Sequence, residues 1–301
     1  MKKTYQSIRI GKQGLTLIEH VNRIIDEYQE AGYTLTLRQV YYQLVAGAII
    51  ENTEKSYKNV GNLINNGRLA GYIDWSSIED RTREVRKPQT WDSPAQILDV
   101  AARTYQRDLW ATQDNYLEVW VEKDALIAVV ENAASRLNCP CFSCRGYASQ
   151  TAMHDAAMRF IEKTEHGKDC ILIYLGDHDP SGLDMTRDIG ERLSGFGAIV
   201  DVRRIALNRD QIDLYNPPVN PAKITDTRAK EYISKHGEHS WELDALKPDV
   251  IDALITDAIK VNLDQKRFNQ AKERQEQNVR RFRQFNFPCT ESQSKRFKGV
   301  F

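Results

Sequence analysis

The sequence predicts an α/β fold in which a parallel sheet is flanked by helices. From residue 116 to about residue 205, short apolar stretches of strand length alternate with longer stretches of helical pattern. One short stretch, residues 170–175, is an almost unbroken apolar run, as expected of a central strand that helices cover on both faces. Before this region, apolar residues recur at helical spacing, which predicts a separate helical N-terminal part.

Three helices followed by a hairpin are expected in residues 1–90. Apolar side chains recur at helical spacing over residues 13–31, Thr36 can cap a second helix, and Gly71 can end a third. The short polar segment at residues 72–86 can then supply a hairpin. This order of elements is that of a winged helix, a common DNA-binding module.

The rest of the chain divides into a connecting segment and a larger domain. Residues 91–115 are expected to form a linker and one helix, and residues 116–301 the sheet domain with a helical C-terminal extension. In that domain, strands are expected at residues 117–121, 141–147, 170–175 and 198–202, helices at 125–137, 150–161 and 183–193, and further helices near 243–260 and 263–284.

The composition excludes some classes of protein. The 42 basic and 42 acidic residues give a formal net charge of zero, so attraction to nucleic acid would have to come from local clusters. No apolar run approaches the roughly 18 residues that a membrane span needs, and no signal-like stretch follows the N-terminus. Five cysteines without a disulfide framework suit a reducing interior. We therefore expect a soluble cytoplasmic protein with no membrane partner.

Acidic side chains follow two of the expected strands, where ligands gather in a parallel sheet. Glu122 directly follows the strand that ends at residue 121, and Asp177 and Asp179 follow the strand that ends at residue 175. Three carboxylates would thus converge and offer the hard oxygen ligands that Mg²⁺ takes. The alternative is that Asp179 only forms a turn and a helix cap. His178, between the two aspartates, is expected to face outward as a bystander.

Two segments around these carboxylates resemble the signature segments of a Toprim domain. They are Val121-Glu122-Lys123-Asp124 and Gly176-Asp177-His178-Asp179-Pro180-Ser181-Gly182, and the resemblance covers about residues 116 to 205. Toprim domains occur in topoisomerases, primases and some nucleases, where the Glu and the Asp-x-Asp hold Mg²⁺. The resemblance therefore implies that role for Glu122, Asp177 and Asp179.

A pair of tyrosines lies in the expected second helix. Tyr41 shares an apolar stripe with Leu37 and Leu44 and is expected in the core, whereas Tyr42 shares a different face with Arg38. A phenol titrates near about 10 and is a weak nucleophile at neutral pH. A neighbouring guanidinium favours the phenolate and can also grip a phosphate. The alternative is that both tyrosines only pack the helix.

The order of a winged helix (CAP-like) before a Toprim domain, together with Arg38-Gln-Val-Tyr-Tyr42, resembles the A subunit of topoisomerase VI and the related meiotic double-strand-break transesterase. The chain looks like a compact, phage-like relative. Ser240-Trp-Glu-Leu-Asp-Ala-Leu246 also resembles a family segment, more weakly. The resemblance implies that Tyr42 attacks DNA and forms a 5′-phosphotyrosyl link, with Arg38 positioning the phosphate. Glu122 and both aspartates would hold Mg²⁺, which stabilises the departing 3′ oxygen.

The same resemblance implies the partners. They are double-stranded DNA and a second copy of the chain, so that the tyrosine of one protomer works with the metal site of the other, in association with the nucleoid of a prokaryotic cell or a phage-infected host. The chain begins about 40 residues before Tyr42, with little room for the extension that holds an ATPase subunit. A requirement for an ATPase B subunit therefore stays open.

Other charged or metal-binding patterns have two interpretations each. Lys55, Lys58 and Arg68 can line the DNA side of the winged helix or form a solvated face. The basic and aromatic residues of 280–298 suit either a DNA backbone contact or a docking helix. The cysteines of residues 139–144 lack an obvious fourth ligand, so we expect no zinc site.

The functional prediction is a Mg²⁺-dependent DNA transesterase that makes double-strand breaks. One alternative is a hydrolytic Toprim nuclease, in which the same carboxylates activate water and Tyr42 is structural. Another is a DNA-binding regulator without chemistry. These motifs do not distinguish an enzyme that reseals the break from one that leaves it open.

Overall fold

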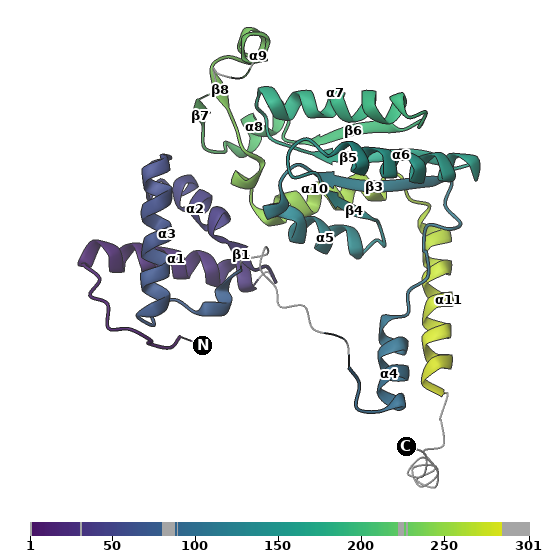
Figure 1. Cartoon of the computed structure of the whole chain (residues 1–301), viewed down its shortest axis with the longest axis horizontal. Coiled ribbons are helices and arrows are strands. Elements are labelled where there is room, and N and C mark those ends of the chain that lie inside the picture. Colours follow the sequence, from purple (N-terminus) through teal and green to yellow (C-terminus); the bar gives the residue numbers. More distant parts are fainter. Residues whose placement is uncertain are drawn as a thin grey trace, which may run out of the picture. The chain divides into compact units, whose positions relative to one another are not determined.

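The computed structural model describes residues 2–30, 32–79, 88, 90–221, 226 and 228–284 (Figure 1). The chain splits into two compact units, Met1–Glu84 with Asp114–Leu263 and Val85–Gln113 with Asp264–Phe301. This division differs from the one expected from the sequence. The N-terminal helices belong to the same unit as the sheet, and the connecting segment belongs with the C-terminal helix.

Three helices form the N-terminal part: α1 (Lys12–Glu30), α2 (Leu37–Ala46) and α3 (Glu54–Leu69). The predicted cap of α2 is confirmed, because the Thr36 side chain accepts from the Gln39 backbone N–H. The Gln39 side chain accepts in turn from the Thr36 N–H at 2.8 Å. This reciprocal pair satisfies two backbone donors that a helix start otherwise leaves free.

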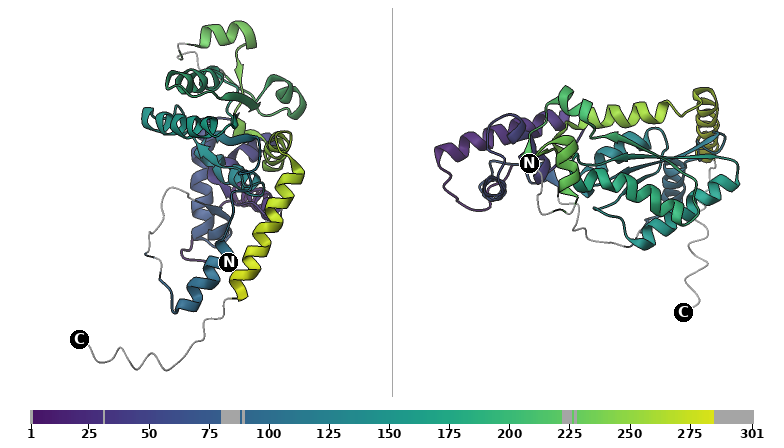
Figure 2. Two further views of the ribbon diagram at one scale, coloured as in Figure 1. Left: turned by 90° about the vertical axis from the view of Figure 1, so that its right-hand side faces the viewer. Right: turned by 90° about the horizontal axis from the view of Figure 1, so that it is seen from above.

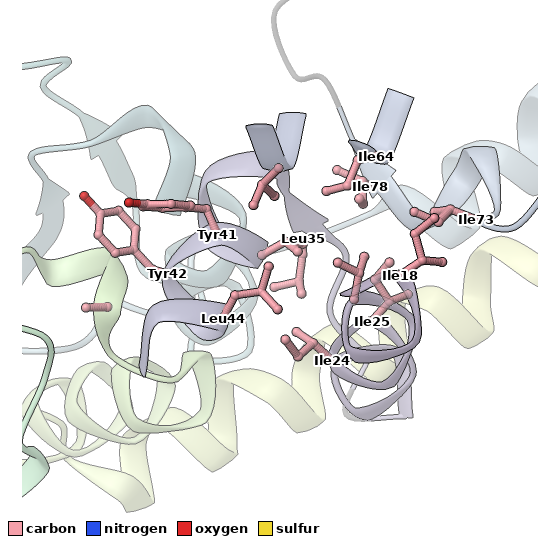
Figure 3. Packing of buried hydrophobic residues seen from close by; sticks show 14 residues of the cluster. Ile18, Ile24, Ile25, Leu35, Tyr41, Tyr42, Leu44, Ile64, Ile73 and Ile78 are labelled. Atoms are coloured by element: carbon pink, nitrogen blue, oxygen red, sulfur yellow. The ribbon is translucent and has the colours of Figure 1, made fainter. Parts of the chain in front are cut away.

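The core of the N-terminal part is apolar and includes both tyrosines (Figure 3). It is built from side chains of all three helices and the short strands beside them. The buried members are Ile18, Val21, Ile24, Ile25, Leu35, Val40, Tyr41, Tyr42, Leu44, Val60, Ile64, Ile73, Ile78 and Ala245. Tyr41 was expected in this core, and Tyr42 joins it at the margin, with its hydroxyl directed away from Leu44 (Figure 3).

One described strand lies in the segment 72–86 that was expected to form a hairpin, and it pairs with a strand outside that segment. Strand β1 (Leu35–Thr36) pairs in parallel with β2 (Ile78–Glu79), which follows the 3-10 turn η1 (Trp75–Ser77). A parallel pair needs a long connection and is therefore not a hairpin. Residues 80–86 of the expected hairpin lie outside the described residues. Among those that are described, the N-terminal part is helical with one short parallel ladder.

The central sheet has four strands, all parallel, in the order β4-β3-β5-β6. The strands are β3 (Asn115–Val121), β4 (Cys141–Ser143), β5 (Asp169–Leu175) and β6 (Asp201–Ala206). Val121 pairs with Leu175, so β3 and β5 end at the same level of the sheet. The parallel sheet flanked by helices that the sequence predicts is confirmed.

Helices cover both faces of this sheet. The 3-10 turn η2 (Asp124–Leu126) leads into α5 (Ile127–Ser135), and α5 and α10 (Pro248–Lys260) pack on one face. On the other face pack α6 (Gln150–Glu165) and α7 (Pro180–Gly195). Side chains of β5 point alternately to the two faces, and Cys170, Leu172 and Tyr174 belong to the core under α6 and α7. Figure 1 shows these two helical layers with the strands between them.

A run of short elements follows β6 and returns to the edge of the sheet. It comprises α8 (Arg209–Tyr215), β7 (Asn220–Pro221), α9 (Ala229–His236), β8 (His239–Ser240) and the 3-10 turn η3 (Leu243–Ala245). Strands β7 and β8 pair in antiparallel fashion. Contacts between η3 and α2 join this segment to the N-terminal helices.

The second unit is a pair of helices, α4 (Pro94–Thr104) and α11 (Gln265–Gln284), which lie side by side (Figures 1 and 2). Side-chain bonds tie them together, such as that from Asn278 Nδ2 to Tyr105 Oη at 2.9 Å. Within the described part of the chain, no helix is both long and apolar enough to span a membrane.

Candidate active site

Two neighbouring strands bring Glu122 and Asp177 together, as the sequence predicts. Glu122 is the residue after β3, and its N–H donates to Leu175 O at 2.9 Å, which extends the ladder by one step. Asp177 leaves β5 two residues after its end, and its N–H donates to Glu122 Oε2 at 2.8 Å. Both side chains are buried, with 7% and 6% of their residues' surface exposed.

Glycines allow the backbone to pass this close to Glu122. A Cβ built on Gly176 would lie 2.9 Å from Glu122 Oε2 and 2.8 Å from Tyr174 Oη, closer than real Cβ atoms come. A Cβ on Gly182 would lie 2.3 Å from Asp177 O. The 176–182 loop, which carries both aspartates, therefore depends on glycine at each of its ends.

Asp179 caps α7. Its Oδ1 accepts from the Gly182 N–H at 2.6 Å and from Ser181 Oγ at 3.0 Å. The turn-and-cap interpretation of Asp179 thus describes its local bonds. Asp179 also lies close enough to Glu122 for its charge to act there. Burial first, and then the Asp179 charge, raise the pKa of Glu122 against the opposing effects of the Asp177 N–H and Lys123.

Asp177 is engaged by its own chain through both carboxylate oxygens. Oδ1 accepts from the Leu243 N–H at 2.8 Å, and Oδ2 pairs with Lys123 Nζ at 2.8 Å. Burial raises the pKa of Asp177, and the charge of Glu122 adds to this, while Lys123 opposes it. Because both oxygens accept hydrogen bonds, these contacts suit the ionised form of Asp177.

Asp177 is one member of a partly buried charge network that links the sheet edge to α2. Lys123 Nζ also contacts Glu242 Oε2 at 2.7 Å and Asp244 Oδ1 at 2.9 Å. From α2, Arg38 Nη2 reaches Glu242 Oε2 at 2.5 Å and Arg38 Nε reaches Asp244 Oδ2 at 2.8 Å. Two cations thus pair with three carboxylates, and these five groups come from four separate parts of the chain.

Sequence reasoning did not assign roles to three members of this network. Lys123 was quoted as part of a motif, and Glu242 and Asp244 lay in the weaker family-like segment. The sequence signal that could have found them is the position of Glu242 and Asp244 among apolar residues such as Trp241 and Leu243, which the structure buries. An acidic residue buried in such a segment needs a cationic partner.

Arg38 and Tyr42 share a helix face, as predicted. The Arg38 guanidinium carbon lies 5.7 Å from the centroid of the Tyr42 ring. Arg38 lowers the pKa of Tyr42, as expected, but other groups outweigh it and the pKa of Tyr42 is raised overall. Burial raises the pKa of Tyr42, the charges of Glu242 and Asp244 raise it further, and Arg38 opposes them too weakly, because its charge is shared by the same two carboxylates.

One cavity joins the tyrosine to the sheet edge. It has a volume of about 620 Å³ and is lined by Arg38, Tyr42, Asp179, Trp241 and Glu242 among others. The structure therefore places the candidate nucleophile, its arginine and one of the three predicted carboxylates around the same space. Glu122 and Asp177 are not among the residues that line it.

The donor set suits Mg²⁺ in chemistry but is incomplete in arrangement. Among the residues that the structure describes, no group of three His, Cys, Asp or Glu side chains is arranged to hold a metal ion. Glu122 and Asp179 repel one another, which a divalent cation would relieve. Asp177 could add an oxygen only if Lys123 moved away. Glu122 and Asp179 thus fit the ion, and Mg²⁺ binding stays a prediction.

His178 is not the outward-facing bystander that was expected. It is 2% exposed, and its Nδ1 lies 2.9 Å from Tyr232 Oη. Its backbone pairs with that of Trp241 in both directions, at 2.9 and 3.0 Å. Burial lowers the pKa of His178 to about 4, so the ring is neutral near pH 7. His178 therefore anchors the segment that carries Glu242 to the sheet edge.

The predicted DNA-contacting residues of α3 have different surroundings. Lys55 and Lys58 are exposed, and Lys58 pairs with Glu54 at 2.7 Å. Arg68 donates to the carbonyl oxygens of Trp75, at 2.9 Å, and of Ile78. Its guanidinium also lies 5.4 Å from a ring centroid of Trp75. Arg68 thus ties the end of α3 to the turn before β2. Of the three predicted DNA-contacting residues, Lys55 and Lys58 are the two whose side chains are exposed to solvent.

Comparison with known proteins finds no matching family model, no matching curated protein and no matching solved structure.

Proposed function

We propose that this chain is a Mg²⁺-dependent DNA transesterase of the topoisomerase VI A-subunit type. In this proposal the four-stranded sheet is a Toprim domain and the N-terminal helices belong to a winged-helix module. The observation that carries the proposal is the shared cavity, which Tyr42, Arg38 and Asp179 all line. Their convergence from α2 and the start of α7 is what a phosphodiester substrate would require.

The reaction exchanges one phosphate ester for another. Tyr42 Oη attacks phosphorus, the bond to the 3′ oxygen breaks, and the 5′ phosphate stays on the tyrosine. Because the ester is conserved, the step is reversible. When bound, Mg²⁺ supplies positive charge to the phosphate and to the departing oxygen. Glu242, which lines the same cavity as Tyr42 and whose charge acts on the phenol, is the carboxylate that would accept its proton.

Arg38 has to change partners for this step. In the structure its guanidinium is bound to Glu242 and Asp244, yet its side chain is 43% exposed. A DNA phosphate can therefore reach it and compete for the same donors. Release from Arg38 would also make Glu242 more basic, which favours proton transfer from Tyr42. Substrate binding and activation of the nucleophile would thus be one event.

The proposal includes a homodimer on double-stranded DNA, with each tyrosine serving the carboxylates of the other protomer. Within one chain, Asp179 is the only one of the three predicted carboxylates that lines the cavity with Tyr42, and this leaves room for a tyrosine that reaches the full set on the other protomer. Lys55 and Lys58, exposed on α3, suit contacts to the DNA backbone. The proposal does not specify whether an ATPase partner subunit is required.

A hydrolytic nuclease is the second candidate. The raised pKa and burial of Tyr42 favour it, because a phenol in that state is a poor nucleophile. In this case the carboxylates would direct water to the phosphate, and Tyr42 would only pack α2 against its neighbours.

The test is a denaturing gel of end-labelled DNA incubated with Mg²⁺ and either the unmodified chain, Tyr42→Phe or Tyr41→Phe. Tyr41 is the matched control, because its hydroxyl is already bonded to Asn52 Oδ1 and Thr53 O. We expect a covalent protein–DNA adduct that only Tyr42→Phe abolishes. Cleavage by all three proteins without an adduct would identify the nuclease. DNA binding without Mg²⁺ and without any cleavage would identify a regulator.

A further inference from the structure

The 176–182 loop, which includes the first residues of α7, has several backbone carbonyls that accept hydrogen bonds from a side chain. Its path is set by the exit of the chain from β5 and by its entry into α7. Buried carbonyl oxygens need donors, and a loop lacks the regular ladder that supplies them in a strand or a helix. What satisfies these oxygens therefore determines where Asp177 and Asp179 lie.

Backbone N–H groups supply part of the set, from Leu207 to Gly176 O at 2.7 Å and from Trp241 to His178 O at 3.0 Å, and one side chain supplies most of the rest. Arg204, on β6, donates from Nη2 to Gly176 O at 2.8 Å and to Asp177 O at 2.5 Å. From Nη1 it donates to Gly182 O at 2.9 Å. A further bond from Nη2 reaches Leu207 O at 3.2 Å, just beyond the end of β6. The guanidinium thus joins both ends of the loop to the neighbouring strand.

The environment of Arg204 holds it in this position. Its guanidinium carbon lies 5.8 Å from the centroid of the Tyr174 ring, and Nη1 also reaches Thr186 Oγ1 at 3.3 Å, on α7. Its positive charge acts on Glu122 and on both aspartates of the loop. Burial lowers the pKa of Arg204, but an arginine keeps its proton at any physiological pH. The same group therefore shapes the loop and offsets the negative charge gathered beside it.

We propose that Arg204 is the positioning residue of the site: it holds the 176–182 loop so that Asp177 and Asp179 face Glu122 and a divalent cation. The proposal deepens the proposed function, since it rests on these carboxylates binding Mg²⁺. It does not depend on whether a tyrosine or a water attacks the phosphate.

A lysine cannot replace this arginine. The guanidinium is a planar fork with five N–H donors, and here it serves four carbonyls that lie in different directions. An ammonium carries three donors on one atom and would reach only part of the set. Arg204→Lys would keep the positive charge but would lose the planar arrangement of donors that reaches the four carbonyls.

The test compares Arg204→Lys with Arg203→Lys in the full chain. Arg203 is the matched control, because it directly precedes Arg204 on the same strand but is exposed. Its guanidinium bonds to Asp201 Oδ2 and Asn262 Oδ1 and not to the 176–182 loop. The first readout is the affinity for Mn²⁺ alone, measured by titration calorimetry. The second is hydrogen–deuterium exchange of residues 176–182 without metal.

We expect Arg204→Lys to weaken Mn²⁺ binding about 10- to 100-fold, the range found when support for metal ligands is lost. Exchange in the loop should become faster, and Arg203→Lys should change neither readout. A purely structural role would lower thermal stability and leave the Mn²⁺ affinity of the folded variant within twofold. That outcome would overturn the proposal, as would a failure of the unmodified chain to bind Mn²⁺.

Two further arms separate the alternatives. If Arg204→Lys does not fold, Thr186→Val removes only one of the anchors of the guanidinium, and we expect a smaller loss of Mn²⁺ affinity, of a few fold. Unchanged affinity in that variant would count against the proposal. If the unmodified chain forms no covalent adduct with DNA but the Arg204 effect on Mn²⁺ persists, the proposed transesterase fails and the positioning role stands.

Discussion

Gly182→Ala is a one-methyl change at the point where the 176–182 loop meets α7. The added Cβ would lie 2.3 Å from Asp177 O and 3.1 Å from Asp179 Oδ1. Real Cβ atoms essentially never approach another heavy atom closer than 3.0 Å, so the Asp177 carbonyl has to retreat by about 0.7 Å. That carbonyl is backbone and also accepts from Arg204, so it cannot swing aside as a flexible side chain can.

Two magnitudes follow from this displacement. Forcing an extra methyl group into a packed site typically costs about 1–3 kcal/mol of unfolding free energy. A displacement approaching 1 Å at catalytic groups can lower a rate by about 100-fold. We therefore expect Gly182→Ala to be destabilised by about 1–3 kcal/mol and to lose about two orders of magnitude of DNA cleavage.

The matched control is Gly190→Ala, in the middle of α7. A Cβ there meets only Val202 Cγ2, at 4.0 Å, which is ordinary contact. Replacing a glycine inside a helix with alanine usually gains about 0.5–1 kcal/mol, because the unfolded chain has less freedom to lose. The two substitutions should therefore shift stability in opposite directions although both add one methyl group to the same helix.

Urea denaturation followed by circular dichroism measures the stability of both variants, and the labelled-DNA gel measures cleavage. The stability part needs no assumption about function. If Gly182→Ala were as stable as the unmodified chain, the close approach of Gly182 to the Asp177 carbonyl would not limit the loop, and the steric reasoning would be refuted. Normal cleavage by a destabilised variant would separate the loop geometry from catalysis.

Three other perturbations test the site. Mixing Tyr42→Phe with Glu122→Ala should restore cleavage as single-strand nicks. About half of the dimers are mixed, and each mixed dimer has one complete site formed in trans. A mixture as inactive as its components would argue for sites within one chain. Lys123→Met should cost about 3–5 kcal/mol in urea, since it leaves buried carboxylates without their cation, and a loss below 1 kcal/mol would show that the network is well hydrated. Burial opposes ionisation of Glu242, but Lys123 and Arg38 outweigh it and hold its pKa at about 2, against an ordinary 4.5. Its contribution to stability is therefore complete above about pH 4.5 and is lost as the pH falls towards 2, and Glu242→Gln should flatten that part of the pH–stability curve.

The sequence by itself determined the sheet, its flanking helices and the place where Glu122 and Asp177 meet. Alternation of apolar stretches reports burial along the backbone, and the carboxyl ends of parallel strands necessarily lie at one edge. The cap at Thr36 was predictable for the same reason, because its partner lies three residues away. Each of these features is set by neighbours that are close in the chain or by a regular repeat.

Only the tertiary structure decided the charge network and the support of the loop. Arg38 and Asp244 are 206 residues apart in the chain, and Lys123 and Glu242 are 119 apart. Nothing local distinguishes such residues from surface charges, since their burial and their partners arise only when distant segments pack. For the same reason the sequence could not show that Glu242 and Asp244 outweigh the effect of Arg38 on the pKa of Tyr42, or that His178 is buried.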